Sequence, residues 1–227
     1  MRRIGALTRY HLELLVRSHA WLPPFLAYAL LLVIGVTQGD PLLGGLGLGA
    51  GALLPVSAWY VRAVLNAEPP ASRACLVAAT GAARVHLGAL LAALTVALLL
   101  AVGEVAALWW VSGAVADAGA RRDPGVGPAL LAGLLTSVVC ALLGVVAGAL
   151  GNRPVLLRSP YGILATLGLA AAALVVPGSP ANGAVSGLVT AARTGLVAVP
   201  WPELLFAAAL LTAVGAGTAA LAGRRAE

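Results

Sequence analysis

The sequence predicts an all-α fold, that of a polytopic integral membrane protein with six transmembrane helices. Composition gives the first reason: 61% of the 227 residues are apolar, only 10% are charged, and the mean hydropathy is +0.99. A water-soluble domain needs about a quarter of its residues charged. At about 20 residues for each span, we expect one membrane domain over residues 1–227 and no separate soluble domain. The order of the apolar runs and the distribution of arginine are the other two reasons.

Six apolar runs predict the six spans. Prolines stand near the start of several runs, where a missing backbone N–H breaks no helical hydrogen bond. These prolines therefore mark helix starts rather than interruptions. The spans are expected at about residues 22–37, 42–64, 85–111, 128–150, 160–176 and 203–222.

Ahead of the first span, residues 1–20 are typical of an amphipathic helix that lies in the headgroup plane. Arg9, Glu13 and Arg17 follow one another at intervals of four residues, so their charges can pair along one helix face. The leucines of this segment lie elsewhere on the helical wheel. A plain juxtamembrane anchor is the alternative interpretation.

The fifth run is short, and the segment after it is irregular. A helix of about 16 residues reaches roughly 24 Å, less than a hydrocarbon core of about 30 Å. The run ends in Pro-Gly-Ser-Pro at 177–180, and a glycine-interrupted apolar stretch follows. We interpret residues 177–201 as a re-entrant or interfacial hairpin on the outer face, because irregular backbone at membrane depth must be surrounded by protein or water. The alternative is a seventh span over residues 182–199, which would bury Arg193 at a cost of about 2.5–3.5 kcal/mol if central.

Arginine placement predicts the orientation, because cytoplasmic loops are enriched in basic residues. All 14 basic residues are arginine. With six spans and the N-terminus inside, three of them fall outside (Arg121, Arg122 and Arg193) and the other eleven fall on the cytoplasmic side. The cytoplasmic set is Arg2, Arg3, Arg9, Arg17, Arg62, Arg73, Arg84, Arg153, Arg158, Arg224 and Arg225. The arginine bias, with much alanine and glycine, indicates a high-GC bacterial genome, so we expect the bacterial cytoplasmic membrane with both termini in the cytoplasm.

Missing residue types exclude several activities. Without lysine, the chain has neither the Walker A lysine nor a Schiff-base amine. By the predicted topology, the three histidines lie on the cytoplasmic side while Ser179 and Ser186 lie outside, so no Ser–His pair can form. No Cys/His cluster has the spacing of metal ligands. We therefore expect no enzyme active site, no metal and no cofactor. The chain carries a net charge of +6, but its basic residues form no clusters with aromatic residues, so we expect no nucleic-acid partner.

Small residues four positions apart predict close helix packing within the membrane. The glycines of residues 44–51 also resemble a dinucleotide-binding motif, but they lie inside an apolar run with no preceding strand. We therefore interpret them as packing faces. The predicted packing pairs are Gly45 with Gly49, Gly47 with Gly51, and Gly144 with Gly148.

Glu104 is the one acidic residue inside an apolar run. Counted from Val85 it lies about 28 Å along the helix, near the outer boundary of the membrane. We expect its side chain to snorkel to water there, with Trp109 and Trp110 beyond it as an aromatic belt. The alternative is a residue of a translocation path, because carboxylates within a membrane mark such paths.

The cytoplasmic connector, residues 65–84, predicts a short helix of its own. Pro69 and Pro70 end the second span, Ser72 is placed to cap a new helix, and Gly81 is placed to end it. The charged residues of the connector are Glu68, Arg73 and Arg84. A plain surface linker is the alternative.

This connector resembles that of the ABC-2 type transporter permease family in the string Glu68, Pro69, Pro70, Arg73, Gly81 and Arg84. The segment opening the outer hairpin, Gly178-Ser179-Pro180-Ala181-Asn182, resembles that family too, as does the order of elements. The resemblance implies a permease subunit of an ATP-driven exporter that pairs with a second permease copy and a separate ABC ATPase. It also implies that Glu68, Arg73, Gly81 and Arg84 couple the permease to the ATPase, and that the substrate is hydrophobic or amphiphilic. A secondary transporter and a membrane scaffold or immunity-type protein are the alternatives.

Overall fold

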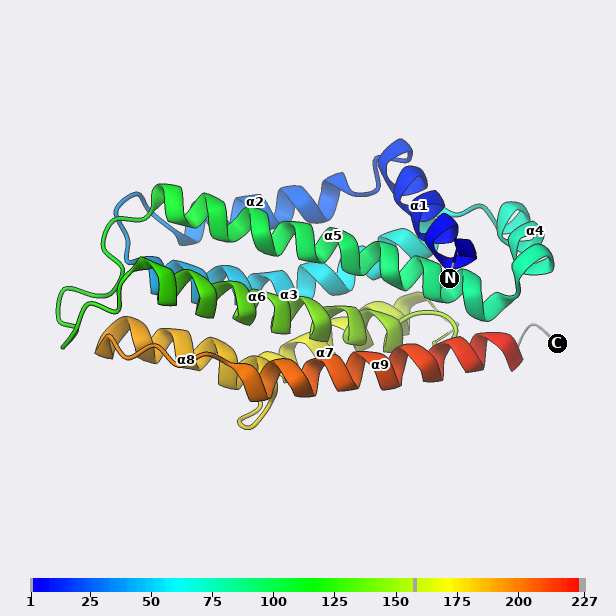
Figure 1. Cartoon of the computed structure of the whole chain (residues 1–227). Helices are drawn as coiled ribbons and strands as arrows, with labels where there is room; N and C mark the ends of the chain where they lie inside the picture. Colours follow the sequence, from blue (N-terminus) through cyan, green and yellow to red (C-terminus); the bar gives the residue numbers. More distant parts are fainter. Residues whose placement is uncertain (1, 157–158, 225–227) are drawn as a thin grey trace.

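The chain forms an elongated bundle of α-helices, and the computed structural model describes residues 2–156 and 159–224. Every regular element in these residues is helical, which confirms the predicted all-α class (Figure 1). The helices are α1 (Arg2–Arg17), α2 (Leu22–Gly35), α3 (Leu42–Ala67), α4 (Pro70–Thr80), α5 (Ala82–Val111), α6 (Val126–Leu150), α7 (Ser159–Val175), α8 (Pro180–Thr194) and α9 (Trp201–Arg224). A helix therefore lies at each predicted apolar run, with ends that differ by a few residues.

The surface of the bundle is apolar, as expected of a protein whose solvent is lipid. Val33 on α2 is 75% exposed, Leu99 on α5 is 67% exposed and Leu205 on α9 is 70% exposed. Among the described residues, α3, α5, α6 and α9 are long and apolar enough to cross a membrane, and the number of spans rises to six if each of two bent helix pairs is one span. The helices are thus those of a multi-pass membrane protein.

Helices α3 and α6 form the centre of the bundle and approach each other closely at the predicted glycines. A Cβ at Gly148 would lie 2.6 Å from the Cβ of Val61, and one at Gly144 would overlap the carbonyl oxygen of Leu54. The same α6 face continues to Gly133, eleven residues earlier, where a Cβ would lie 2.6 Å from Leu46. Eleven residues make about three turns, so this third glycine could have been found from the sequence.

Close helix packing was predicted for all four of these α3 glycines, but their surroundings differ from one to the next. Gly45 packs beside Val36 and Leu108, and Gly47 beside Leu188 of α8, each with space for a methyl group. Gly49 faces the carboxyl group of Glu104. Among the described residues, nothing lies within 4 Å of a Cβ placed at Gly51, so no helix of this chain packs closely on it, and its predicted packing role stays a prediction.

Helix α1 lies steeply across the bundle and bends by 74° into α2 (Figure 1). Its buried face is formed by Leu7, His11 and Leu15, while the predicted Arg9–Glu13 ion pair lies on the outside at 2.8 Å. In the described part of the chain, Arg17 forms no ion pair, so the predicted pairing stops at Glu13. An amphipathic helix at 2–17 is thus confirmed; its place in the headgroup plane stays a prediction.

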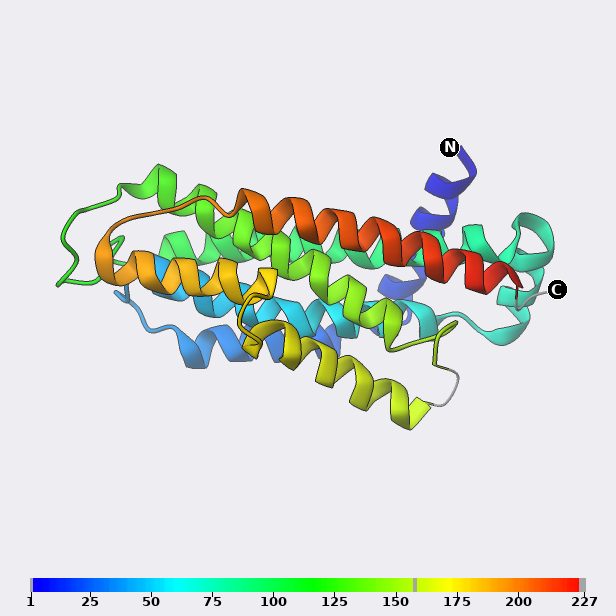
Figure 2. The ribbon, with the colours of Figure 1, turned by 90° about the horizontal axis from the view of Figure 1, so that it is seen from below.

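Helices α7 and α8 follow each other with a bend of 46°. Figure 2 shows α7 (yellow) reaching only to about the middle of the bundle, with α8 (orange) continuing to one end. The short fifth run therefore makes a short helix, as expected. A bend of this size fits either one interrupted span or a re-entrant segment, so the outer hairpin over residues 177–201 stays a prediction.

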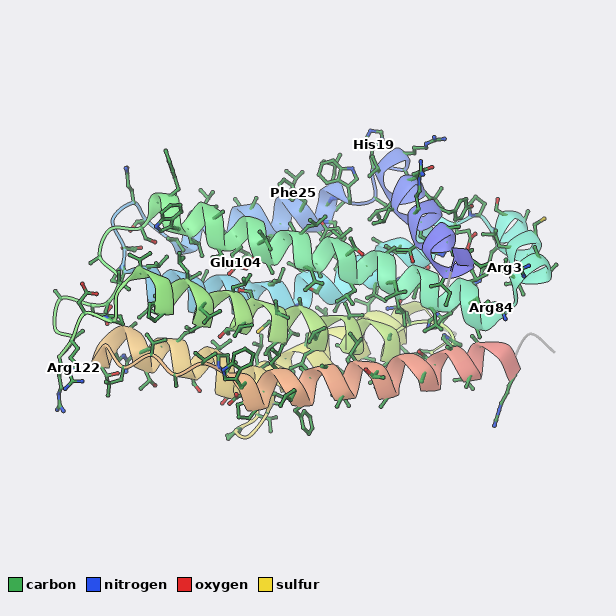
Figure 3. The ribbon with its side chains drawn as sticks, in the orientation of Figure 1. Arg3, His19, Phe25, Arg84, Glu104 and Arg122 are labelled. Atoms are coloured by element: carbon green, nitrogen blue, oxygen red, sulfur yellow. The ribbon has the colours of Figure 1, made fainter. Side chains whose placement is uncertain are left out.

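The two ends of the bundle differ in charge. The start of α1, the whole of α4 and the end of α9 lie toward one end, which we call the basic end (Figure 1). Figure 3 shows Arg3 and Arg84 at this end and Arg122 at the opposite one. At the opposite end, the connectors 36–41 and 112–125 lie together through backbone hydrogen bonds such as Gly113 N–H to Asp40 O, at 3.2 Å. The predicted cytoplasmic arginines Arg158 and Arg225 lie outside the described residues, as does residue 1.

Candidate functional site

The first candidate site is a polar cluster around Glu104, inside the bundle. The Glu104 side chain is only 3% exposed. The Tyr28 hydroxyl donates a hydrogen bond to Oε2 of Glu104, and the Ser137 hydroxyl donates one to Oε1 at 3.3 Å. The Tyr28 hydroxyl also lies 3.2 Å from the carbonyl oxygen of Gly49. The cluster thus joins α2, α3, α5 and α6.

The predicted snorkelling of Glu104 to water is therefore wrong. Its distance along α5 places it toward the end opposite the basic end, but α2, α3 and α6 surround it there. Gly49 makes this possible, because a side chain at that position would occupy the space of the carboxyl group. The exposed aromatic residues of α5 are Trp109 and Trp110, 56% and 87% exposed.

Beside this cluster, a groove of about 560 Å³ lies between α1, α2 and α5; we call it the lateral groove. Its wall is mainly apolar, and Glu104, Tyr28 and Tyr60 are among the residues that line it. Figure 3 shows Phe25 on α2 at the bundle surface and Glu104 inside. The other residues lining it are Leu12, Leu15, Val16, Trp21, Phe25, Ala29, Leu32, Val96, Leu99, Leu100, Gly103 and Ala107.

The second candidate site is a cavity of about 770 Å³ at the basic end; we call it the basic-end cavity. The end of α3, the inner face of α4, the connector after α6 and the first turn of α7 enclose it. Among the described residues, its charged ones are Arg62, Arg73, Arg153 and Glu68. The Arg62 Nη1 donates to Asn152 Oδ1 at 3.2 Å, and Asn152 Nδ2 donates to the Gly148 carbonyl oxygen at 2.8 Å. These bonds fix one guanidinium group in the cavity wall.

The structure brings together only part of the predicted coupling set. Glu68 and Arg73 both line the basic-end cavity, but Arg84 does not. Instead, Arg84 Nη1 donates to the Thr80 carbonyl oxygen at 3.1 Å and caps the end of α4. Gly81 ends α4, as predicted, with φ 89° and ψ 142°. The predicted cap at Ser72 is wrong, because α4 begins two residues earlier at Pro70.

Glu68 lies at a junction of α1, α3, α4 and α5. It borders a small cavity of about 10 Å³ together with His11, Arg73 and His86. Burial raises the pKa of the Glu68 carboxyl, while Arg73 and a hydrogen bond from the Tyr10 hydroxyl act in the opposite direction. His86 Nε2 lies 3.1 Å from the Thr218 hydroxyl, which connects the junction to α9. The base of α4 is thus tied to the bundle by polar contacts.

Helix α4 itself has no buried residue. Its exposed residues are mostly small: Ala71, Ala74, Cys75, Ala78 and Ala79, of which Ala74 and Ala78 also line the basic-end cavity. These exposed side chains give the helix a smooth, largely apolar surface at the tip of the bundle (Figure 1).

Sequence reasoning missed most partners of both sites. Tyr28 and Ser137 are polar residues within apolar runs, and this was the available signal for the Glu104 cluster. Arg62 and Arg153 flank the ends of predicted spans, where basic residues indicate orientation, and nothing in the sequence pattern marks Asn152 as their partner. In the described residues, no group of three or more His, Cys, Asp or Glu side chains could hold a metal ion.

Comparison with protein-family models, with curated proteins and with solved structures finds no match to this chain. The sites above therefore rest on their own geometry.

Proposed function

We propose that the chain is the membrane-embedded permease subunit of an ATP-driven exporter of the ABC-2 type. In this proposal, two permease copies form the membrane core, and a separate ATPase docks on each at the cytoplasmic face. The basic end is the cytoplasmic face of a bacterial plasma membrane. The chain makes six spans, with α1 in the interface and α8 in an outer re-entrant segment.

The lateral groove is the observation that carries this proposal. Its volume lies within the range of about 300–1,000 Å³ typical of sites for organic ligands. Its apolar wall suits a hydrophobic chain, and the buried Glu104 cluster lies beside that wall. A groove with these properties favours a hydrophobic or amphiphilic substrate over an inorganic ion.

Helix α4 supplies the contact with the ATPase in this proposal. It is the element with no buried residue, and it is joined to α5 through the single glycine Gly81. Glu68 and Arg73 connect its base to α1 and α5. Movement of the ATPase pair would thus reach the helices that form the groove.

Co-purification and ATP hydrolysis test the proposal. We expect the tagged chain, expressed from its own chromosomal locus, to co-purify with a protein that carries a Walker A motif. The rate at which this complex hydrolyses ATP should fall several-fold in Glu68→Ala or Arg73→Ala. The matched control is Glu13→Ala, which removes a charge from the exposed face of α1. Purification of an intact chain without any such ATPase would contradict the proposal.

A groove-filling variant tests the substrate path. Nothing lies within 4 Å of a Cβ at Gly103, so Gly103→Phe projects into the groove without displacing a neighbour. The apolar dye N-phenyl-1-naphthylamine is added to the purified chain, and the fluorescence of the dye in detergent alone is subtracted. We expect Gly103→Phe to reduce the remaining fluorescence by more than half. Gly217→Phe, at an equally open position on α9, should leave the signal unchanged.

A secondary transporter is the second candidate, and the burial of Glu104 is the observation that favours it. Buried carboxyl groups carry protons in such transporters. Transport driven by a pH gradient in proteoliposomes without ATP, and lost in Glu104→Gln, would support this second candidate over the first.

A further inference from the structure

The basic-end cavity combines three arginines with one carboxylate. Arg73 comes from α4, Arg62 from the end of α3 and Arg153 from the connector after α6. The remaining charged residue, Glu68, also faces the junction with α1, where it interacts with the Tyr10 hydroxyl. The cavity is therefore complementary to an anion, because its positive charges exceed its negative ones.

One of the three arginines, Arg62, is held in place by its neighbours. Asn152 holds the Arg62 guanidinium at 3.2 Å and is itself held by the Gly148 carbonyl oxygen. Gly162 opens the α7 side of the cavity: a Cβ there would lie 3.7 Å from Arg62 Nη1 and 2.6 Å from the Gly151 carbonyl oxygen. Guanidinium groups recognise phosphate oxygens through paired hydrogen bonds.

The size and position of the cavity favour a phosphate that belongs to a lipid over a free phosphate ion. At about 770 Å³, the cavity is far larger than one phosphate ion requires, and its wall includes the apolar side chains of Leu65 and Leu156. Helix α7 continues away from the cavity with Leu164 and Leu167 69% and 56% exposed. An amphiphile can thus place its charged group among the arginines and its chains along α7.

We propose that the basic-end cavity binds the headgroup of an anionic phospholipid. Arg73 and Arg153 contact the phosphate, Arg62 and Asn152 form the fixed wall, and the acyl chains lie against α7. Basic pockets between transmembrane helices on the cytoplasmic side bind such headgroups. The lipid links α4 to the connector after α6, and the site does not depend on what the chain transports.

Binding of defined lipids to the full chain tests this proposal. The purified protein is stripped of lipid in detergent and titrated with phosphatidylglycerol, phosphatidylcholine or inorganic phosphate, and bound lipid is counted by native mass spectrometry. We expect phosphatidylglycerol to bind at least about tenfold more tightly than phosphatidylcholine. The variant Arg73→Gln/Arg153→Gln should lose that preference.

The control variant is Arg9→Gln/Arg17→Gln, which removes two exposed arginines from α1, neither of which lines the cavity. It changes the net charge equally but leaves the cavity intact, so the lipid preference should persist. If the first double variant does not fold, Arg153→Gln alone, at an exposed position, should weaken the preference in part. Three outcomes would overturn the proposal. The two lipids bind equally, both double variants lose the lipid preference equally, or equimolar inorganic phosphate displaces the lipid.

Discussion

At the scale of single residues, Gly49 and Gly51 differ although each belongs to a predicted pair of glycines four residues apart on α3. The first faces the Glu104 carboxyl, and the second has open space beside it. A pattern of small residues marks a face where something approaches closely, but whether a helix backbone or a side chain approaches depends on the register of the neighbouring helix.

We predict opposite effects of alanine at these two positions. Gly49→Ala should destabilise the protein by about 1–3 kcal/mol, because the new methyl group displaces the Glu104 carboxyl from its hydrogen bonds. Gly51→Ala should stabilise it by about 0.5–1 kcal/mol, because alanine favours the helix. Thermal unfolding in detergent gives the comparison, and equal shifts in Tm for the two variants would contradict the packing described for Gly49.

A second residue-scale prediction concerns the pH dependence of stability. Because burial raises the pKa of Glu68, the folded chain holds this proton at pH values where the unfolded chain has lost it. The contribution of Glu68 to the stability of the folded chain is therefore fully present below the ordinary glutamate pKa. It is lost as the pH rises through the raised pKa of the folded state. We expect Glu68→Gln to flatten the decline of Tm between pH 4.5 and neutral pH. Glu13→Gln, at an exposed position, controls for net charge. If Tm falls with pH as steeply in Glu68→Gln as in the wild type, Glu68 is not the source of the pH dependence.

At the scale of elements, the joint between α4 and α5 depends on Gly81. Its φ of 89° lies in the left-handed region that side chains avoid, and no atom lies within 4 Å of a Cβ there. The strain of a substitution is thus conformational, without a steric clash with neighbours.

We predict that Gly81→Ala destabilises this joint by about 1–2 kcal/mol. Protease cleavage or hydrogen exchange within α4 should rise, while the core of α3 and α6 stays protected. Gly103→Ala is the matched control, since it lies within α5 at an equally open position with ordinary helical geometry. Unchanged exchange in Gly81→Ala would argue against a strained joint.

The elements themselves were largely predictable, because a span of apolar residues in lipid satisfies its backbone only as a helix. The positions of α3 and α6 follow from their runs, and Gly144 and Gly148 predict their close contact. The Glu104 cluster was not predictable in the same way. It requires Tyr28 and Ser137, which are 76 and 33 residues away along the chain, to meet one carboxyl group. Only tertiary packing brings them together.

At the scale of the whole molecule, the two cysteines report the sidedness of the bundle. Cys75 lies exposed on α4 at the basic end, and Cys140 is buried in α6. A reagent that does not cross membranes can therefore reach only the first from water.

We predict that a membrane-impermeant maleimide labels Cys75 in inside-out vesicles and not in intact cells. The control is Gly119→Cys in a Cys75→Ala background, which places a thiol in the exposed connector at the opposite end. It should show the reverse pattern. Labelling of both positions from the same side would contradict the proposed topology.

The unbroken length of α5 has a consequence for how distant parts of the molecule can move together. From Ala82 to Glu104 the helix is about 33 Å long, with α4 attached at one end and the carboxyl group near the other. Leu7 of α1 bears on it at Gly88, where a Cβ would lie only 2.7 Å from that leucine's Cβ. A rigid rod that pivots at its α4 end is a lever: a tilt of about 5° about Ala82 moves position 104 by about 3 Å. Such a shift is as large as a hydrogen bond is long, so a slight tilt of α5 at the α4 end is sufficient to separate Glu104 from Tyr28.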